Sequence, residues 1–266
     1  EGAARGHVRT LASSCTHTGL HEMPREAGAG KAGLSAEDVG VLRAEFPGVS
    51  RLATAGVVLC DGAGGSQVHS SVAAAMQEQL ATRNFNVGAP FPGSEANLVA
   101  WTHARETLAA FLNCRAQELV FGPSATALTF HMARSLARGH GAWRIGAGDN
   151  LVVTELDHAC NVGPWEALAR ETGAAIRRVS MEHSSWTLCE DSVRANIDER
   201  TKLVAVGAAS NLIGSVHDLR GVVSHARAVG ALSVVDAVHM APHALLDVEA
   251  MGCDLLVCSP YKFFGP

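Results

Sequence analysis

An acidic residue, Asp236, and a basic residue, Lys262, each follow a short apolar run near the end of the sequence. The first run covers residues 231–235, and the second, 254–258, leads through a Ser-Pro pair to the lysine. Short apolar runs bounded by polar or turn residues are typical of buried strands in a parallel sheet. Ligands of open α/β sheets bind beyond the carboxyl ends of such strands. We therefore expect a carboxylate and an amine at the same end of one sheet.

This pair suits a cofactor that carries an aldehyde. Loss of solvent penalises an ammonium group and lowers its pKa, so a lysine in apolar surroundings becomes a competent nucleophile. Pyridoxal 5'-phosphate (PLP) supplies an aldehyde, and its pyridinium nitrogen needs a carboxylate partner to stay protonated and act as an electron sink. Lys262 and Asp236 fit these two roles. For such residues in isolation, a turn-capping aspartate and a surface lysine are the commoner explanation.

Three earlier strand ends carry further candidates. Ser124, Ala125 and Thr126 open a predicted helix, where free N–H groups and the helix dipole make an anion site for a phosphate. A simple N-cap explains the same residues. At the next strand end, in residues 155–161, a ring could lie flat on a planar cofactor. Asn211 could donate its amide to the cofactor's phenolate oxygen, and a turn asparagine is an equally good explanation.

Two groups of residues resemble metal ligands, but neither of them predicts a metal site. Asp157, His158 and Cys160 are nearly consecutive, so their side chains point in divergent directions, and no second ligand cluster accompanies them. His239 and His243 have the spacing of a helical pair, but the proline between them disfavours a regular helix. We therefore expect no metal.

Length and composition exclude several classes of function. The 266 residues are 47% hydrophobic and 18% charged, which is typical of a soluble globular protein with a substantial core. A net charge of -5 does not indicate the basic surface that binds nucleic acid. No apolar run reaches the roughly 18 to 20 residues that span a bilayer. Seven cysteines without a C-x-x-C pair favour a reduced, cytoplasmic location, with organellar targeting left open.

Predicted strands alternate with helical stretches over most of the chain after residue 118. The strands cover 119–121, 151–154, 175–179, 203–206, 232–235 and 255–258, and an earlier one is expected at 57–59. Helices are predicted from Ser35, near 67–82, from Ser94, over 127–137 and from Asp218. This alternation predicts an α/β fold with a mostly parallel sheet flanked by helices in three α/β/α layers.

The chain divides into two regions. Residues 1–34 are rich in Gly, Ala and Arg and lack a sustained apolar period, which predicts a disordered extension. Residues 35–266 are predicted to form an N-terminal arm and a large cofactor-binding domain. The sequence stops directly after the Lys262 motif, so we expect a truncated form of a longer protein.

Five motifs together resemble the class V aminotransferase family of fold-type I PLP enzymes, and its cysteine desulfurase-like branch in particular. They are Ser124-Ala125-Thr126, Asp157-His158-x-x-Asn161, Ala209-Ser210-Asn211, the Val-Asp-Ala-Val-His run at 235–239 and the Ser-Pro-Tyr-Lys-Phe-Phe-Gly-Pro run at 259–266. The similarity runs from about residue 57 to the last residue. The resemblance implies the large domain of the PLP-transferase fold, without the small C-terminal domain.

The resemblance also implies residue roles. The catalytic residues would be Lys262 as the Schiff-base lysine, Asp236 as the partner of the pyridine nitrogen and His158 as the residue that stacks on the ring. Phosphate would be bound by Ser124, Ala125 and Ser259 with Thr126 nearby, and Asn211 and His239 would lie near the phenolate oxygen. The family further implies a homodimer. Tyr261 and His239 depart from the His and Gln that many members carry at these positions.

These expectations lead to one preferred function and three alternatives. The preferred function is a PLP-dependent, cysteine desulfurase-like reaction on a small amino acid, in which sulfur leaves cysteine, alanine is formed and a sulfur-acceptor protein takes part. None of the seven cysteines occupies the place of the family's persulfide-forming residue, so none is assigned that role. The alternatives are another class V reaction (transamination, lyase or epimerase chemistry), a non-catalytic PLP-binding fragment, and a nicotinamide-dependent oxidoreductase.

Overall fold

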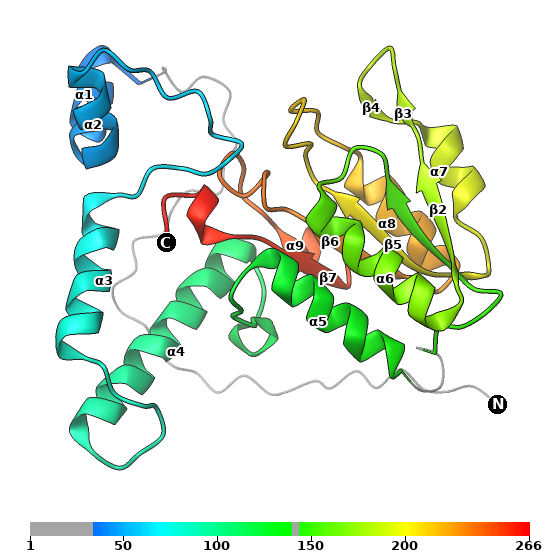
Figure 1. Cartoon of the computed structure of the whole chain (residues 1–266), viewed down its shortest axis with the longest axis horizontal. Helices are drawn as coiled ribbons and strands as arrows, with labels where there is room; N and C mark the ends of the chain where they lie inside the picture. The colour runs from blue at the N-terminus through cyan, green and yellow to red at the C-terminus, as the bar shows by residue number, and fades with distance from the viewer. Residues whose placement is uncertain (1–33, 140–143) are drawn as a thin grey trace.

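The computed structural model describes residues 34–139 and 144–266, and its centre is a five-stranded parallel sheet (Figure 1). The strands are β1 (Asn150–Thr154), β2 (Ala175–Val179), β5 (Thr201–Gly207), β6 (Leu232–Asp236) and β7 (Leu255–Val257). They lie in the order β2-β1-β5-β6-β7, and every pair is parallel. The last five of the predicted strands are therefore confirmed. Residues 1–33, predicted to be a disordered extension, lie outside the described residues.

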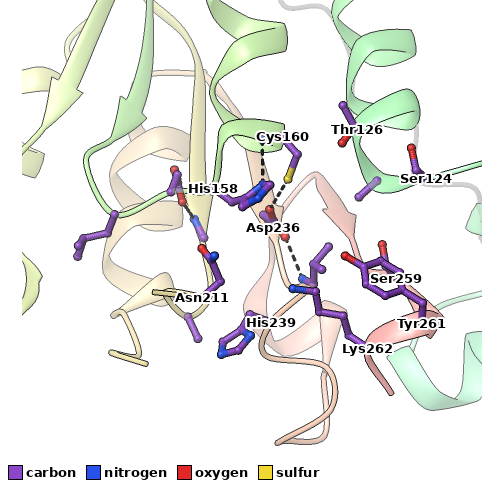
Figure 2. A pocket seen from close by; sticks show the side chains of 16 residues that line it. Ser124, Thr126, His158, Cys160, Asn211, Asp236, His239, Ser259, Tyr261 and Lys262 are labelled. Atoms are coloured by element: carbon purple, nitrogen blue, oxygen red, sulfur yellow. Dashed lines mark hydrogen bonds between the residues drawn. The ribbon is translucent and has the colours of Figure 1, made fainter. Parts of the chain in front are cut away.

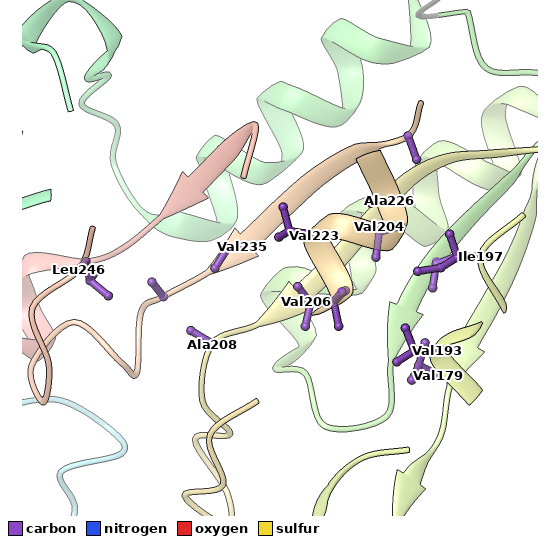
Figure 3. Close-up of a cluster of buried hydrophobic side chains, with 14 of the residues drawn as sticks. Val179, Val193, Ile197, Val204, Val206, Ala208, Val223, Ala226, Val235 and Leu246 are labelled. Carbon is purple, nitrogen blue, oxygen red and sulfur yellow. The ribbon is translucent and has the colours of Figure 1, made fainter. Parts of the chain in front are cut away.

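Helices cover both faces of the sheet because its strands carry apolar side chains on both sides. Val204 and Val206 of β5 pack in one cluster with α7 (Glu190–Asn196) and α8 (Leu219–Ala228) (Figure 3). Leu203 and Ala205 point to the opposite face, into a second cluster with α5 (Ala125–Ala137) and α6 (Gly163–Thr172). This alternation along one strand confirms the three-layer α/β/α arrangement.

The remaining elements lie before the sheet or in its connections. They are α1 (Ala36–Ala44), α2 (Pro47–Thr54), α3 (Ser70–Thr82), α4 (Pro92–Leu112), η1 (Ala116–Glu118), η3 (Ala159–Asn161), the hairpin of β3 (Met181–Glu182) and β4 (Thr187–Leu188), α9 (Val248–Met251) and η4 (Pro260–Lys262). Helices α1, α2 and α3, coloured blue and cyan in Figure 1, stand apart from the sheet. No helix among the described residues combines the length and apolar character needed to cross a bilayer.

Two predicted strands are wrong. Residues 57–59 and 119–121 are not strands in the structure, and Val58 and Val120 in their middle are 83% and 71% exposed. A strand requires a neighbouring strand to accept and donate its backbone hydrogen bonds, and neither segment has one. Apolar β-branched side chains alone therefore gave a misleading signal at both places.

Two helix boundaries depend on proline, and the second corrects a prediction. The helix predicted from Ser35 ends at Ala44, since Pro47 starts α2 and restricts the residue before it. The long helix α4 begins at Pro92, two residues before the predicted cap Ser94. Proline is favourable in the first turn of a helix because its missing N–H would have no partner there.

Candidate active site

One pocket gathers all nine candidate site residues of the sequence (Figure 2). They are Ser124, Ala125, Thr126, His158, Asn211, Asp236, His239, Ser259 and Lys262. Four parallel strands end at this place: His158 follows β1, Asn211 follows β5, His239 follows β6 and Ser259 follows β7. Because parallel strands have their carboxyl ends at one edge of the sheet, residues more than a hundred positions apart meet there.

The carboxyl group of Asp236 has a defined orientation at the end of β6. Its Oδ1 accepts a hydrogen bond from the Val238 N–H at 2.9 Å. Its Oδ2 accepts a hydrogen bond from the Cys160 thiol at 3.3 Å (Figure 2). Both oxygens therefore have donors from the protein itself, and these two hydrogen bonds fix the orientation of the carboxyl group.

The side chain of Lys262 is buried, with 8% of its surface exposed. The residue ends the short helix η4, where its N–H donates to the Ser259 carbonyl at 3.1 Å. Its Nζ donates to the Ala63 carbonyl, and the ring of Tyr261 lies 5.7 Å from the same nitrogen. The amine therefore points into the protein, against a segment of the N-terminal arm.

That segment, residues 61–66, clamps the turn that carries Lys262. The N–H and the hydroxyl of Ser66 donate to the Tyr261 carbonyl at 3.1 and 3.0 Å. The Ser66 hydroxyl in turn accepts from the Phe264 N–H at 2.7 Å. A Cβ on Gly65 would lie 3.3 Å from the Tyr261 ring, so this close approach uses the small size of glycine.

The N-terminus of α5 forms the wall of the pocket where a phosphate was expected. Ser124 is the N-cap, and its hydroxyl oxygen accepts from the Ala127 N–H at 3.1 Å. The N–H groups of Ala125 and Thr126 belong to the first helical turn, where no intrahelical acceptor exists. Ser124 therefore acts as the N-cap of α5, and a phosphate site at this helix start stays a prediction.

The two pocket histidines have different surroundings. His158 is exposed, and its Nδ1 accepts from the Cys160 N–H at 3.1 Å, so the ring caps η3 (Figure 2). His239 is half-buried, and its Nδ1 is buried without a hydrogen-bond partner among the described residues. Burial, followed by the charges of Lys262 and His243, lowers the pKa of His239. At neutral pH this ring is therefore mostly uncharged.

Sequence reasoning missed three groups that the structure brings to the site. Cys160 donates to Asp236, and Ala63 accepts from Lys262 through its backbone, 199 positions away. Asp157 also lines the pocket, although its position in the Asp157-His158-x-x-Asn161 motif was the only sequence signal for it. The sequence signal for the contact at Ala63 is the glycine content of residues 61–65, because glycine permits close approach of the backbone.

Burial distinguishes the two rings that follow β1. Trp165, which follows the 155–161 segment, is fully buried in the core, and its indole N–H donates to the Asn161 side chain at 3.4 Å. Of the rings of His158 and Trp165, only that of His158 lines the pocket, and its stacking on a ligand stays a prediction. Within residues 34–139 and 144–266, no group of three or more His, Cys, Asp or Glu side chains is arranged to hold a metal ion.

Comparisons with known proteins identify relatives of this chain. Residues 58–266 match the family described as "Aminotransferase class-V". The "Probable cysteine desulfurase 2" of Mycobacterium leprae is 34% identical over 240 residues, which cover 88% of this chain and 56% of the relative. The "Aminotransferase-like protein FGM3" of Gibberella zeae is 29% identical, covering 85% of this chain and 55% of the relative.

A solved structure has the same fold. The cysteine desulfurase CsdA from Escherichia coli aligns with a TM-score of 0.73 and 26% sequence identity, over 85% of this chain and 55% of that one. The present chain thus spans about half the length of the relatives it matches. Since the family match covers most of the sequence and extends over the whole pocket, the chain belongs to the class V aminotransferase family of PLP-dependent enzymes, in its cysteine desulfurase-like branch.

Proposed function

We propose that this chain forms the cofactor-binding part of a PLP-dependent enzyme that removes sulfur from cysteine and yields alanine. One observation carries the proposal: a buried amine, a carboxylate with an ordered orientation and a helix N-terminus line the same pocket. These are the three groups that a pyridoxal ring with an aldehyde, a ring nitrogen and a phosphate requires.

The pocket residues fit PLP by their unused hydrogen-bonding capacity. The Nδ1 of His239 is buried and lacks a partner within the described protein, and this residue lines the pocket. Buried polar atoms without partners are rare in proteins and are commonly satisfied by a bound ligand or water. Ser124, Ser259 and the first turn of α5 add donors suited to a phosphate.

Each pocket residue has a distinct task in the proposed reaction. When bound, PLP supplies an aldehyde and an electron-accepting ring. Asp236 would pair with the ring nitrogen, and the imidazole of His158 would stack on the ring. Lys262 would hold the aldehyde carbon, and its amine would be placed to move a proton at the Cα atom of the amino acid.

A second candidate function is another class V reaction, such as transamination, a lyase step or epimerisation. Desulfuration needs a thiolate to accept sulfur, and the pocket cysteine is Cys160. Burial, together with the charge of Asp236, raises the pKa of Cys160 to about 12, so this thiol stays protonated at neutral pH. A protonated thiol is a poor nucleophile. Reactions that need only Lys262 and Asp236 are favoured by this observation.

Partners and location belong to the same proposal. We propose a homodimer, which the exposed apolar side chains of α3 and α4, including Leu80 and Val99, support. If desulfuration is the reaction, the sulfur acceptor is a thiol outside this pocket, such as that of an acceptor protein. The composition and the free thiols of the described cysteines support a cytoplasmic location.

Borohydride reduction tests the proposal. The protein is incubated with PLP, reduced, digested and analysed by mass spectrometry, and we expect a pyridoxyl group on Lys262. Lys262→Ala should abolish the tag, and Lys202→Ala, which removes a lysine on β5 away from the pocket, should leave it unchanged. Reduced wild-type protein without a tag on Lys262 would refute PLP binding at this site.

The substrate is then tested on the loaded protein. Incubation with cysteine that releases alanine together with sulfide or a protein persulfide supports desulfuration. Formation of a keto acid supports transamination instead. A tagged Lys262 without turnover of any amino acid would support the alternative of a non-catalytic PLP-binding chain.

A further inference from the structure

The carboxyl group of Asp157 lines the pocket without a task in the proposed reaction. Its Oδ1 accepts a hydrogen bond from the N–H of Gly207, at the end of β5. Its Oδ2 is buried and has no hydrogen-bond partner among the described residues. A buried carboxylate with one oxygen unpaired is unfavourable, so this arrangement calls for a physical explanation.

Gly207 makes the space that this carboxyl occupies. A Cβ at position 207 would lie 2.6 Å from Asp157 Oδ1, which is closer than real Cβ atoms approach. In the β5–β6 register, Gly207 is the direct partner of Asp236. The two carboxyl groups are therefore held at the ends of β1 and β6, on either side of the end of β5, where Gly207 lies.

Two carboxyl groups in one buried pocket do not both ionise readily, because each charge opposes the other and neither is well solvated. Asp236 accepts two hydrogen bonds, from the Val238 N–H and the Cys160 thiol, whereas Asp157 accepts from Gly207 on one oxygen only. Burial, and next the charge of Asp236, raise the pKa of Asp157 to about 7. A negative charge on Asp236 is thus stabilised by more hydrogen bonds than a negative charge on Asp157.

The other titratable groups around the pair come from three elements. Those that line the same pocket are His158 and Cys160 after β1, His239 after β6, and Tyr261 and Lys262 in η4. Among them, Cys160 interacts with both carboxyl groups, and its protonated thiol donates to Asp236. A thiol held in its protonated form acts here only as a donor, which again stabilises a negative charge on Asp236.

We propose that Asp157 is a positioning residue for Asp236: it takes up the single proton that the two carboxyl groups share and thereby keeps Asp236 ionised toward the ring nitrogen of PLP. The proton resides on Oδ2, because Oδ1 accepts from Gly207. Loss of this proton places a second negative charge beside Asp236 and alters the environment of the ring nitrogen. This inference rests on the proposed function, and its first test does not require the cofactor.

The first test measures the carboxyl groups of the full chain without cofactor. Asp157→Asn preserves the acceptor for Gly207 and puts an NH₂ group where the proton resides, so it imitates the protonated form. In protein labelled with ¹³C at the aspartate carboxyl, we expect one resonance that titrates with a midpoint near pH 7. This resonance should be lost in Asp157→Asn and retained in Asp191→Asn, a matched change at an exposed site on α7. If every aspartate titrates below about pH 5, the shared proton does not exist and the inference is overturned.

The second test follows the absorption of bound PLP against pH. In wild-type protein we expect a spectral change with the same midpoint as the carboxyl resonance, and in Asp157→Asn the loss of that step. A purely structural role would leave the pH profile of Asp157→Asn identical to that of wild type, and this result would overturn the link to Asp236. Gly207→Ala, which displaces the Asp157 carboxyl, should shift the midpoint as well.

The two tests separate failure of this inference from failure of the proposed function. A carboxyl resonance near pH 7 in protein that takes up no PLP supports the shared proton and overturns the proposed function. Uptake of PLP on Lys262 with no such resonance supports the proposed function and overturns the role of Asp157.

Discussion

Asp236 and Lys262 lie in the pocket with their side chains already oriented by the protein. The Asp236 carboxylate has a donor on each oxygen, and the Lys262 amine donates to a backbone carbonyl from the N-terminal arm. Groups that are oriented before a ligand arrives lose little conformational entropy when it binds. Single substitutions at these positions should therefore change binding without rearranging the fold.

Asp236→Asn should weaken PLP binding while the protein stays folded. The asparagine oxygen can still accept from the Val238 N–H, but the neutral amide cannot stabilise a protonated ring nitrogen. Losing a charge-assisted hydrogen bond of about 1.5–3 kcal/mol corresponds to a dissociation constant raised roughly 10- to 150-fold. An absorbance titration with PLP measures the change, and Asp191→Asn serves as the control. Equal affinity in the variant and wild type would remove Asp236 from the cofactor site.

His217 should make the protein less stable at mildly acidic pH. The residue is 6% exposed, neither ring nitrogen has a hydrogen-bond partner in the part of the chain that the structure describes, and burial lowers its pKa. Below about pH 6.5 the unfolded chain binds a proton at this histidine that the folded protein does not, so stability falls as pH falls. The loss is at most about 1.4 kcal/mol per pH unit for one group.

Urea unfolding between pH 7 and 5 measures this effect. His217→Leu should remove part of the loss, whereas His103→Leu, at an exposed position of α4, should retain all of it. A variant at position 217 with the same pH dependence as wild type would show that the buried ring does not set the acid sensitivity.

At the scale of elements, the start of α5 and the ends of four parallel strands decide where the pocket lies. Helix α5 begins at Ala125, beside the ends of β6 and β7, and Ala125, Val238 and Val257 pack in one apolar cluster. The helix start therefore faces the same edge of the sheet as Asp236. Its N-cap residue has two separable effects, one on the helix and one on a bound phosphate.

Substitutions of Ser124 should separate these effects. Ser124→Ala loses the N-cap hydrogen bond and should lower the free energy of unfolding by about 1 kcal/mol. Ser124→Asp should keep the cap but repel the phosphate, so it should lower PLP affinity more than Ser124→Ala does. Unfolding curves and PLP titrations measure the two quantities. Ser35→Ala, at the N-cap of α1, should reduce stability without changing PLP affinity, and an unchanged affinity in Ser124→Asp would exclude the helix start as the phosphate site.

At the scale of the whole molecule, the N-terminal arm exposes apolar surface that the sheet domain does not cover. Leu80 in α3 is 72% exposed and Val99 in α4 is 69% exposed, and Figure 1 shows α3 standing away from the sheet. Phe46, between α1 and α2, nevertheless packs on Phe264 with ring centroids 5.3 Å apart. The arm thus connects exposed apolar helices to the turn that carries Lys262.

The exposed helices should form a contact between two copies of the chain. Light scattering after size-exclusion chromatography should give twice the mass of one chain, and the double variant Leu80→Glu/Val99→Glu should shift it toward one chain. Trp186→Glu, in the β3–β4 hairpin, alters an exposed aromatic residue distant from the arm in Figure 1 and should leave the mass unchanged. A wild-type protein with the mass of one chain at micromolar concentration would contradict the proposed dimer.

The sequence alone predicted the central sheet and the set of residues around the pocket. Buried parallel strands need apolar side chains on both faces, and this requirement is visible locally at 151–154, 203–206 and 232–235. The residues that follow parallel strands must lie at the same edge of the sheet. The sequence alone therefore placed Asn211, Asp236 and Lys262 together. Their chemical roles remain predictions.

Only the tertiary structure decided which groups complete the site and which apolar segments pair. Residues 57–59 and 119–121 have the composition of strands, but a strand forms only beside a partner, and partners are set by distant parts of the chain. The contacts of Lys262 with Ala63 and of Asp157 with Gly207 join positions 199 and 50 residues apart. Such contacts depend on backbone atoms and on space left by a missing side chain, and neither leaves a pattern in the sequence.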